Sequence, residues 1–292
     1  MNVMHASLRR FRAQPGQYIG RAALYAIVAL GSLPFVVPLI WMIRTSVMPA
    51  WQIDIFPPLW WPAEFRWENY IDPFREMPFL TYYRNTIVMT TMNVLGVTLS
   101  CSLVAYGFAR LRFPGRRILF LLVLSTVMLP FHITLIPKYI LFTKLGWINT
   151  FKPLIVPEWL ASDAFYIFLL RQYFLGIPRE LEDAAKIDGC NYFRIFWHII
   201  IPLSLPALGV VAIFSFTGHW NSFMGPLLYL NTRDKFTIPL ALAGFQARNH
   251  SGVSQWGKLM AMSLVSMAPL LIAFFIAQRH TLRGIAIGGY KQ

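Results

Sequence analysis

The sequence has few charged residues and only two cysteines. Charged residues make up 13% of its 292 residues, whereas they make up about a quarter of a typical soluble protein. Cys101 lies in an apolar stretch and Cys190 in a polar loop, so we expect no disulfide between them, and neither belongs to a metal-ligand spacing. The scarcity of charge argues against a soluble fold, and the cysteines indicate neither redox nor metal chemistry.

The sequence is instead rich in long apolar stretches. Hydrophobic residues make up 57% of the chain, and they gather into six stretches long enough to cross a bilayer. The first follows a basic start, as in a signal peptide, but it has no small-residue cleavage site, so we expect it to be retained. The composition therefore predicts an all-α, polytopic membrane protein with six transmembrane helices in residues 22–283. The expected spans are residues 22–43, 85–109, 118–136, 154–175, 201–223 and 259–277.

The basic residues are distributed unevenly between the two sides of this arrangement. With an even number of spans both termini lie on one side, and that side receives most of the 26 Lys and Arg residues but a minority of the 12 acids. Because loops rich in Lys and Arg stay in the cytoplasm, we expect tail 1–21, loop 178–200 and tail 284–292 to be cytoplasmic. The net charge of +14 does not indicate nucleic-acid binding, since the basic residues form short clusters typical of contact with membrane lipid.

The longest polar segment between two of the apolar stretches is residues 178–202, PRELEDAAKIDGCNYFRIFWHIIIP. Pro178 can start a helix, carboxylates follow in its first turns, and Gly189 favours the left-handed conformation that ends it. A second short helix with one apolar face is expected next. Such a face in a polar loop indicates docking to a partner protein, and the alternative is a helix lying on the bilayer surface. The apolar residues of this face are Tyr192, Phe193, Phe196, Trp197 and Ile200.

This loop resembles the cytoplasmic coupling loop of ABC importer permeases. The signature of that loop is E-A-A-x-x-x-G, nine residues, and then I-x-L-P, and the spacing here is complete, with an Asp for Glu and an Ile for Leu. The segments YGFARLRFPGRR (106–117) and LPFHITLIPKY (129–139) are similar to the second permease of carbohydrate importers, the maltose-transporter type. The residues that match the signature are Asp183, Ala184, Ala185, Gly189, Ile199, Ile201 and Pro202.

The resemblance implies a type I permease fold and a set of partners in the plasma (inner) membrane of a prokaryote. These are a second homologous permease that completes a heterodimer, two ATP-binding cassette subunits and an extracytoplasmic solute-binding protein. Glu182 or Asp183 would pair with a basic group of an ATPase subunit, the aromatic residues would fill its socket, and tail 284–292 would reach its interface. The residues expected to couple to the ATPase are Glu182, Asp183, Ala184, Ala185, Asp188, Gly189, Phe193, Phe196, Trp197 and Pro202.

The same resemblance implies that this chain is a transport subunit and not an enzyme. We expect no cofactor on this chain, and ATP with Mg at the partner ATPase subunits. Residues 252–258 match all but the last position of the phosphate-binding pattern G-x-x-x-x-G-K-[ST]. At that last position Leu259 replaces the Ser or Thr whose hydroxyl would bind magnesium. The solute implied is a sugar or sugar-like compound of the oligosaccharide, disaccharide or glycerol phosphate class.

The candidate substrate path is His219-Trp220-Asn221-Ser222, late in the fifth expected span. Sugars are bound where an aromatic ring covers their C–H face and polar side chains replace water at their hydroxyls. Helix packing alone is the alternative for these residues. The family often carries an aspartate where Ser222 stands, so the resemblance does not identify the sugar.

Two other classes of membrane protein remain as alternatives. A polytopic enzyme acting on a lipid-linked sugar would need convergent acids or a metal cluster at one membrane face, and an ion-coupled secondary carrier would need an acid or an acid–His relay near the midplane. Glu158 and Asp163 are expected near the outer end of the fourth span, as helix caps or solvated groups. The sequence therefore predicts no such relay.

Overall fold

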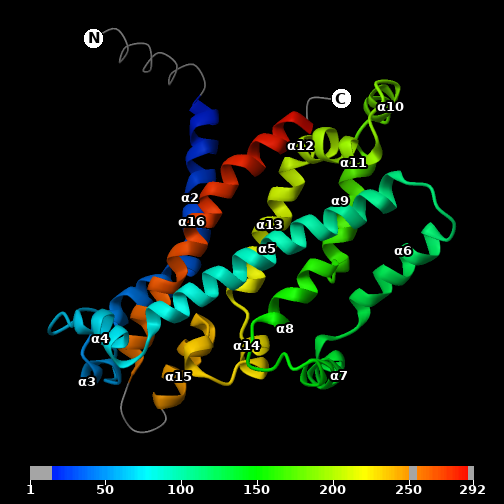
Figure 1. The fold of residues 1–292 in the computed structure, drawn as a ribbon. Helices are drawn as coiled ribbons and strands as arrows, with labels where there is room; N and C mark the ends of the chain where they lie inside the picture. Colours follow the sequence, from blue (N-terminus) through cyan, green and yellow to red (C-terminus); the bar gives the residue numbers. More distant parts are fainter. Residues whose placement is uncertain (1–14, 250–254, 289–292) are drawn as a thin grey trace.

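Helices dominate the described part of the chain. The computed structural model describes residues 15–249 and 255–288, and within these ranges it contains no strand (Figure 1). The all-α prediction is therefore confirmed for this part. The α-helices are α2 (Pro15–Ser46), α3 (Ala50–Ile53), α4 (Glu68–Glu76), α5 (Phe79–Arg110), α6 (Arg116–Ser125), α7 (Phe131–Lys144), α8 (Lys152–Ile155), α9 (Ala164–Leu175), α10 (Glu180–Ile187), α11 (Tyr192–Ile195), α12 (Ile201–Leu203), α13 (Leu205–Trp220), α14 (Met224–Tyr229), α15 (Ile238–Asn249) and α16 (Trp256–Gly288). The others are the 3-10 helices η1 (Thr126–Met128), η2 (Val156–Leu160) and η4 (Arg233–Lys235) and the π-helix η3 (Phe196–Ile200).

Four helical segments are long and apolar enough to cross a membrane by themselves. Two further pairs of helices meet the same criteria when the members of each pair are taken together, so the described residues contain up to six spans. This number agrees with the six expected spans, although two of them are bent. The four single segments are Ala23–Ser46, Phe79–Arg110, Lys152–Leu175 and Trp256–Ile276.

The third span is bent, and the straight helix expected over residues 118–136 is wrong. Arg116–Met128 and Phe131–Lys144 lie at 100° to each other. The break falls at Leu129, which has extended backbone angles (φ −81°, ψ 112°). The ring of the following Pro130 disfavours a helical conformation for the residue before it, which accounts for the break.

The fifth span is also bent, where the sequence predicts one helix over residues 201–223. Tyr192–Leu203 and Leu205–Trp220 meet at 79°. Ser204 forms the corner (φ −101°, ψ 6°), and Pro206 lies in the first turn of α13, where a missing N–H leaves no hydrogen bond unmade. The second part of the polar loop, from Tyr192, therefore runs as one helical segment up to the corner, and the membrane helix α13 ends at Trp220.

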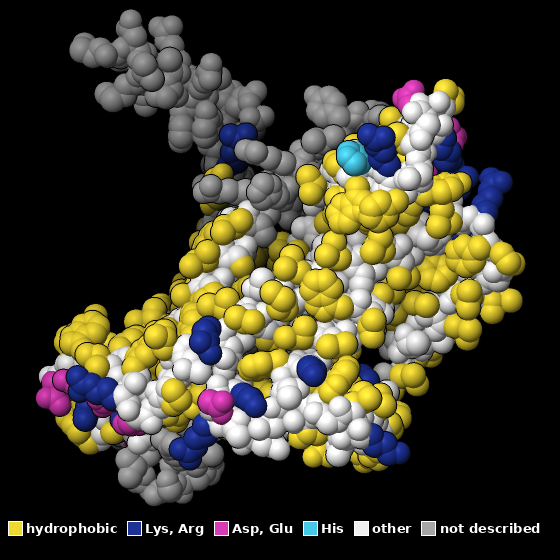
Figure 2. All heavy atoms as spheres, viewed as in Figure 1, with side chains coloured by type: hydrophobic (Ala, Val, Ile, Leu, Met, Phe, Trp, Pro, Cys, Tyr) yellow, Lys and Arg dark blue, Asp and Glu magenta, His cyan; other side chains and the backbone are white. Residues whose placement is uncertain are grey.

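Helix α5 lies at the centre of the fold and packs against α9 and α13, while α16 packs against α2 and α13. One hydrophobic core, which includes Tyr106, Leu170 and Phe196, joins α5, α9 and α13 to the polar loop. A second core, which includes Phe79 and Trp220, joins α5 and α13 to α15 and α16. The middle of the visible surface is largely hydrophobic, and most charged side chains lie nearer the ends (Figure 2).

The beginning of α2, the end of α16 and the short helix α10 lie at one end of the molecule, and α3, α4 and α15 lie at the other (Figure 1). This placement agrees with an even number of spans. Residues 15–21 and 284–288 are helical, so the expected boundaries of both tails fall inside helices. Residues 1–14 and 289–292 of the expected tails lie outside the described residues.

Candidate functional site

The polar loop folds as two short helices separated by a glycine turn. Helix α10 begins with carboxylates in its first turn and has Lys186 in its last, as the helix dipole favours. Gly189 has a φ of +81°, in the left-handed region that only glycine adopts without strain, and this confirms the expected bend. Asn191 then caps α11 by accepting a hydrogen bond from the Arg194 N–H (2.8 Å).

An exposed apolar tip lies around this turn. The side of the loop facing away from the core carries Ile187, which is 88% exposed, and Phe193, which is 65% exposed. Tyr192 and Trp197 are also exposed beside them. The aromatic members of this tip were expected from the sequence, but Ile187 was not, although it is the one large apolar residue directly before the Asp-Gly turn.

Two residues expected to meet a partner are instead buried against the membrane helices. Glu182 is 4% exposed, and its Oε1 lies 2.8 Å from Nε of Arg110, the last residue of α5. Phe196 is 1% exposed, and its ring centroid lies 5.2 Å from that of Tyr106. The expectation that Glu182 pairs with an ATPase subunit and that Phe196 fills its socket is therefore wrong for this structure. The expected coupling residues that remain exposed are Asp183, Ala184, Asp188, Gly189, Phe193, Trp197 and Pro202, whereas Ala185 is buried.

Asp183, next to Glu182, faces solvent. Its Oδ1 accepts a hydrogen bond from Lys186 Nζ at 2.9 Å, and both side chains remain largely exposed. This hydrogen bond lowers the pKa of the Asp183 carboxyl and raises the pKa of Lys186. An exposed pair of this kind contributes little to stability and opens readily. Of the two adjacent acids, Asp183 is therefore the one that can meet a basic group elsewhere.

A cavity of about 620 Å³ lies between α5, α7, η2, α13 and α14. Its lining combines aromatic rings, which include Phe131, Phe142 and Trp147, with polar groups. Rings and hydrogen-bonding groups together are the combination that a sugar requires. The polar and charged side chains in the lining belong to Asn93, Lys138, Glu158, Ser162, His219, Ser222 and Tyr229.

His219 connects the polar groups of this cavity. Its Nδ1 lies 3.1 Å from the Asn93 amide nitrogen, which can only donate, so Nδ1 accepts and the ring hydrogen is on Nε2 when the ring is neutral. Nε2 lies 3.9 Å from Oε2 of Glu158. Asn93 is near the middle of α5, so this group lies deep among the helices. The sequence predicts no acid–His relay near the midplane, and the structure does bring an acid and a histidine together in this cavity, at a separation longer than a hydrogen bond.

The other acid of the fourth span behaves as expected. Asp163 caps α9 by accepting a hydrogen bond from the Phe165 N–H at 2.9 Å. Glu158 instead belongs to the 3-10 helix η2, just before Ala161, whose φ of +54° interrupts the span. The irregular backbone turns the Glu158 side chain into the cavity, and helical periodicity alone could not predict this.

The four residues of the expected substrate path separate into two groups. His219 and Ser222 line the cavity. Trp220 is 3% exposed, stacks on Phe216 and donates a hydrogen bond from Nε1 to the Ser266 carbonyl (3.1 Å), so it belongs to the second core. Asn221 is exposed and donates to the Thr217 carbonyl at 2.9 Å. The structure thus corrects the expectation for Trp220 and Asn221.

The comparison with known protein families identifies the chain. The model of the family described as "Binding-protein-dependent transport system inner membrane component" matches residues 77–286, which include α5, the polar loop and α13. The chain belongs to this family of ABC importer permeases. The polar loop of the permease is called the coupling loop below.

Similar proteins and structures agree with this assignment. The Arabinooligosaccharides transport system permease protein AraQ of Halalkalibacterium halodurans is 35% identical over 88% of this chain and 91% of its own length. The Trehalose/maltose transport system permease protein MalG of Thermococcus litoralis is 32% identical over 92% and 94%. The fold is similar to that in a bacterial ABC transporter involved in the import of the acidic polysaccharide alginate, with a TM-score of 0.75 at 24% identity over 92% of this chain and 97% of the other.

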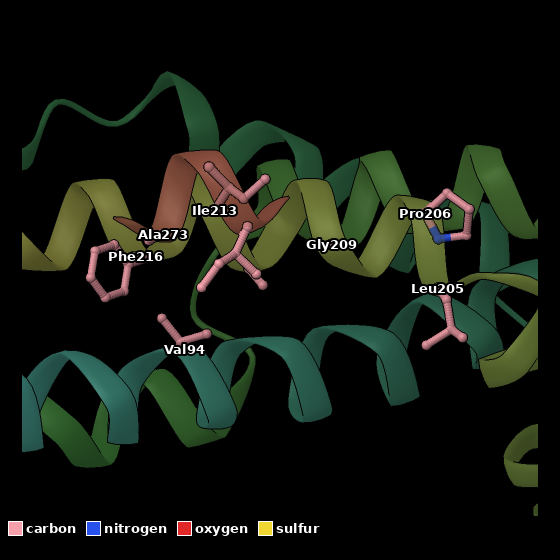
Figure 3. Close-up of a pocket in the computed structure, with 9 residues that line it drawn as sticks. Val94, Leu205, Pro206, Gly209, Ile213, Phe216 and Ala273 are labelled. Carbon is pink, nitrogen blue, oxygen red and sulfur yellow. The ribbon is translucent and has the colours of Figure 1, made fainter. Parts of the chain in front are cut away.

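A second hollow in the permease has a different character. It measures about 520 Å³ and lies between α5, α13 and α16 (Figure 3). Its lining residues are apolar, with Val94, Ile213 and Phe216 among them, and it offers no side-chain hydrogen bonds to a sugar. The cavity around His219 is therefore the better candidate for the solute.

Residues that sequence reasoning missed complete the candidate cavity of the permease. Asn93 is an amide in the middle of an apolar span, and this position alone is a signal of function. Lys138 and Tyr229 carry no comparable local signal, because they reach the cavity only through the bend of the third span and the short helix α14. Outside the cavity, sequence reasoning also missed Arg110, which contacts Glu182 of the coupling loop. In the sequence it is one of several arginines in a basic cluster that follows an apolar stretch.

Proposed function

We propose that this permease moves a sugar or sugar-like solute inward through the cavity around His219. The observation that carries the proposal is the meeting of Asn93, His219, Glu158 and Ser222 with aromatic rings in one cavity. Its volume of about 620 Å³ lies within the ~300–1,000 Å³ of typical small-molecule sites. Relatives named for arabinooligosaccharides and trehalose or maltose support a solute of the oligosaccharide or disaccharide class, and glycerol phosphates are the alternative.

The energy comes from ATP hydrolysis by two partner ATPase subunits, which hold ATP and Mg. The exposed tip formed by Tyr192, Phe193, Trp197 and Ile187 enters a socket on one of these subunits, and Asp183 pairs with a basic group there. The tip supports this role because large apolar side chains exposed together mark an interaction site. With the coupling loop docked on a cytoplasmic ATPase subunit, the beginning of α2 and the end of α16 are cytoplasmic too; their position at the same end of the molecule supports this (Figure 1).

A heterodimer with a second homologous permease completes the pathway, and an extracytoplasmic solute-binding protein delivers the solute. Closure of the ATPase subunits moves the coupling loop, and the membrane helices then alternate between inward-facing and outward-facing arrangements. His219, Asn93 and Ser222 hold the solute hydroxyls during this change. Ser222 follows the end of α13 and lines the same cavity as His219, so both can contact one solute.

The experiment that tests this function is purification of the full chain from its native membrane with its co-purifying subunits. Ile187→Ser and Phe193→Ser should each reduce the amount of ATPase subunit retained, and Phe56→Ser is the matched control. Phe56 is 90% exposed but lies in the loop between α3 and α4, at the other end of the molecule.

Reconstituted complex should then import labelled oligosaccharides or disaccharides only in the presence of ATP. His219→Ala should reduce this uptake at low solute concentration while the ATPase subunit stays bound. Retention of the ATPase subunit by the Ile187 and Phe193 variants would contradict the docking assignment, and normal uptake by the His219 variant would contradict the cavity assignment.

A further inference from the structure

We propose that Arg110 is a positioning residue that locks the coupling helix α10 to the membrane helices α5 and α9. Movement of the coupling loop then passes to both membrane helices at once. This inference rests on the proposed function, because the coupling loop must receive movement from an ATPase subunit. It adds a residue to which the family signature assigns no role, since Arg110 lies outside the coupling loop.

The guanidinium of Arg110 contacts three structural elements. It belongs to the last residue of α5, and its Nε lies 2.8 Å from Oε1 of Glu182 in the first turn of α10. Its Nη2 donates to the carbonyl of Phe174 at 2.5 Å and to that of Ile177 at 2.6 Å. A single side chain therefore joins the end of α5, the end of α9 and the beginning of α10.

The chemistry of each contact explains why an arginine is required. The last carbonyls of a helix have no partner within the helix, and they attract a positive charge. Phe174 lies in the last turn of α9, where its carbonyl also accepts from the Ile177 N–H at 3.1 Å, and Ile177 lies just beyond the helix. Arg110 adds a positively charged donor to both carbonyls. The planar guanidinium spreads its donors over three nitrogens and can reach these carbonyls and the Glu182 carboxylate together, whereas a lysine carries its three donors on one nitrogen of a shorter side chain.

Burial makes this contact a firm link. The side chains of Arg110 and Glu182 are 2% and 5% exposed, and the surrounding core contains Ala185, Phe174 and Phe196. Separating the pair would leave a charge without a partner in an apolar environment. Glu182 therefore cannot move away from Arg110 during transport without a large cost, and α10 must move with α5.

The neighbouring ion pair provides an internal contrast. The Asp183–Lys186 pair lies within α10 itself, and its side chains are 66% and 41% exposed, so water replaces either partner when the pair opens. Of these two adjacent acids, Asp183 faces outward and Glu182 faces inward. The first serves docking, and the second transmits the movement that docking receives.

The test is the ratio of solute imported to ATP hydrolysed, measured on the full complex in proteoliposomes. Glu182→Gln keeps the shape of the side chain but removes its charge, and Arg110→Lys keeps the charge but replaces the planar fork of donors by a single, shorter ammonium group. Glu182→Gln should lower the ratio by about fivefold or more, while ATP hydrolysis per assembled complex is retained. Arg110→Lys should give an intermediate ratio, and Arg117→Gln, which alters an exposed arginine in the first turn of α6, should keep the wild-type ratio.

The outcomes separate this inference from the function on which it rests. A wild-type ratio in both assembled variants would overturn the link. So would uptake and hydrolysis that fall together in proportion to the amount of assembled complex, because this would indicate a role in folding alone. If the wild-type complex imports solute without ATP, the proposed function fails and the inference fails with it. If import by the wild-type complex requires ATP and the assembled variants import less solute per ATP hydrolysed, the result supports the link.

Discussion

The two functional regions of the permease are built in opposite ways. At the coupling loop, helices α10 and α11 pack on a continuous hydrophobic core and are tied to it by a buried ion pair. At the solute cavity, the backbone is irregular, with the 3-10 helix η2, the left-handed Ala161 and a 100° bend before α7. A part that transmits movement must be stiff, whereas a site that binds and releases solute needs backbone that can rearrange.

The largest expected effect comes from removing the link at the stiff end. Arg110→Ala should destabilise the permease by about 3–5 kcal/mol, because it leaves the Glu182 carboxylate buried and unpaired. Thermal unfolding of the detergent-solubilised complex measures this change. Arg117→Ala, at an exposed arginine in the first turn of α6, should leave the unfolding temperature unchanged. If the two variants lowered the unfolding temperature equally, the Arg110–Glu182 pair would have no special role in stiffening the coupling loop.

Two phenylalanines of the coupling loop sharpen the comparison, because Phe196 is buried and Phe193 is 65% exposed. Phe196→Ala should destabilise the fold by about 3–5 kcal/mol, as expected for a large core side chain. Phe193→Ala should change stability by less than about 0.5 kcal/mol but should weaken retention of the ATPase subunit. Unfolding and co-purification, measured on the same samples, distinguish these effects. Loss of stability in the Phe193 variant would contradict its assignment as a docking residue.

At the cavity, His219→Ala should affect solute handling more than stability. Loss of its hydrogen bonds should weaken apparent solute affinity by about tenfold or more, measured as the KM for uptake at unchanged amounts of complex. Thr217→Val, at an exposed position of the same helix, is the control. Trp220→Ala should show the reverse behaviour, with lower stability, because its ring belongs to the second core. A changed KM without lost stability in the Trp220 variant would return this residue to the substrate path.

The smallest effect is expected at Asp183. Its pKa is lowered by Lys186, so any stabilisation would be present above the pKa of the unfolded carboxyl and lost as the pH falls through the folded value. Because the pair is exposed, we expect Asp183→Asn to leave the unfolding temperature unchanged at pH 7 and at pH 5. A difference between the variant and the wild type that disappears at low pH would show that this pair also contributes to the stiffness of the loop.

Local signals in the sequence account for the elements but not for their contacts. Gly189 predicts its turn because only the backbone of one residue is involved, and the six apolar stretches predict the membrane helices. The bends at Pro130 and Ser204 were not predicted, because prolines also occur in continuous membrane helices whose neighbours satisfy the backbone. A proline in the sequence therefore permits a corner without requiring one.

Contacts between distant residues lay beyond prediction from one sequence. Asn93 and His219 are 126 positions apart, and their pairing follows from the packing of α5 on α13. The adjacent acids Glu182 and Asp183 have the same local chemistry, so only the orientation of α10 on the core decides which one is buried. The proposal of a coupling loop could therefore be made from sequence spacing, whereas the burial of Glu182 and the exposure of Asp183 required the fold.

The packing of α2 has a consequence for biosynthesis. In the described structure α2 packs mainly on α16, which follows all the other described helices in the chain. Helix α2 must therefore wait in lipid while the helices between them are made. Residues 22–43 contain no Asp, Glu, Lys or Arg, and the hydroxyl of Ser32 donates to the Ala29 carbonyl at 2.7 Å within the helix. The waiting helix therefore brings no charged side chain into the hydrocarbon.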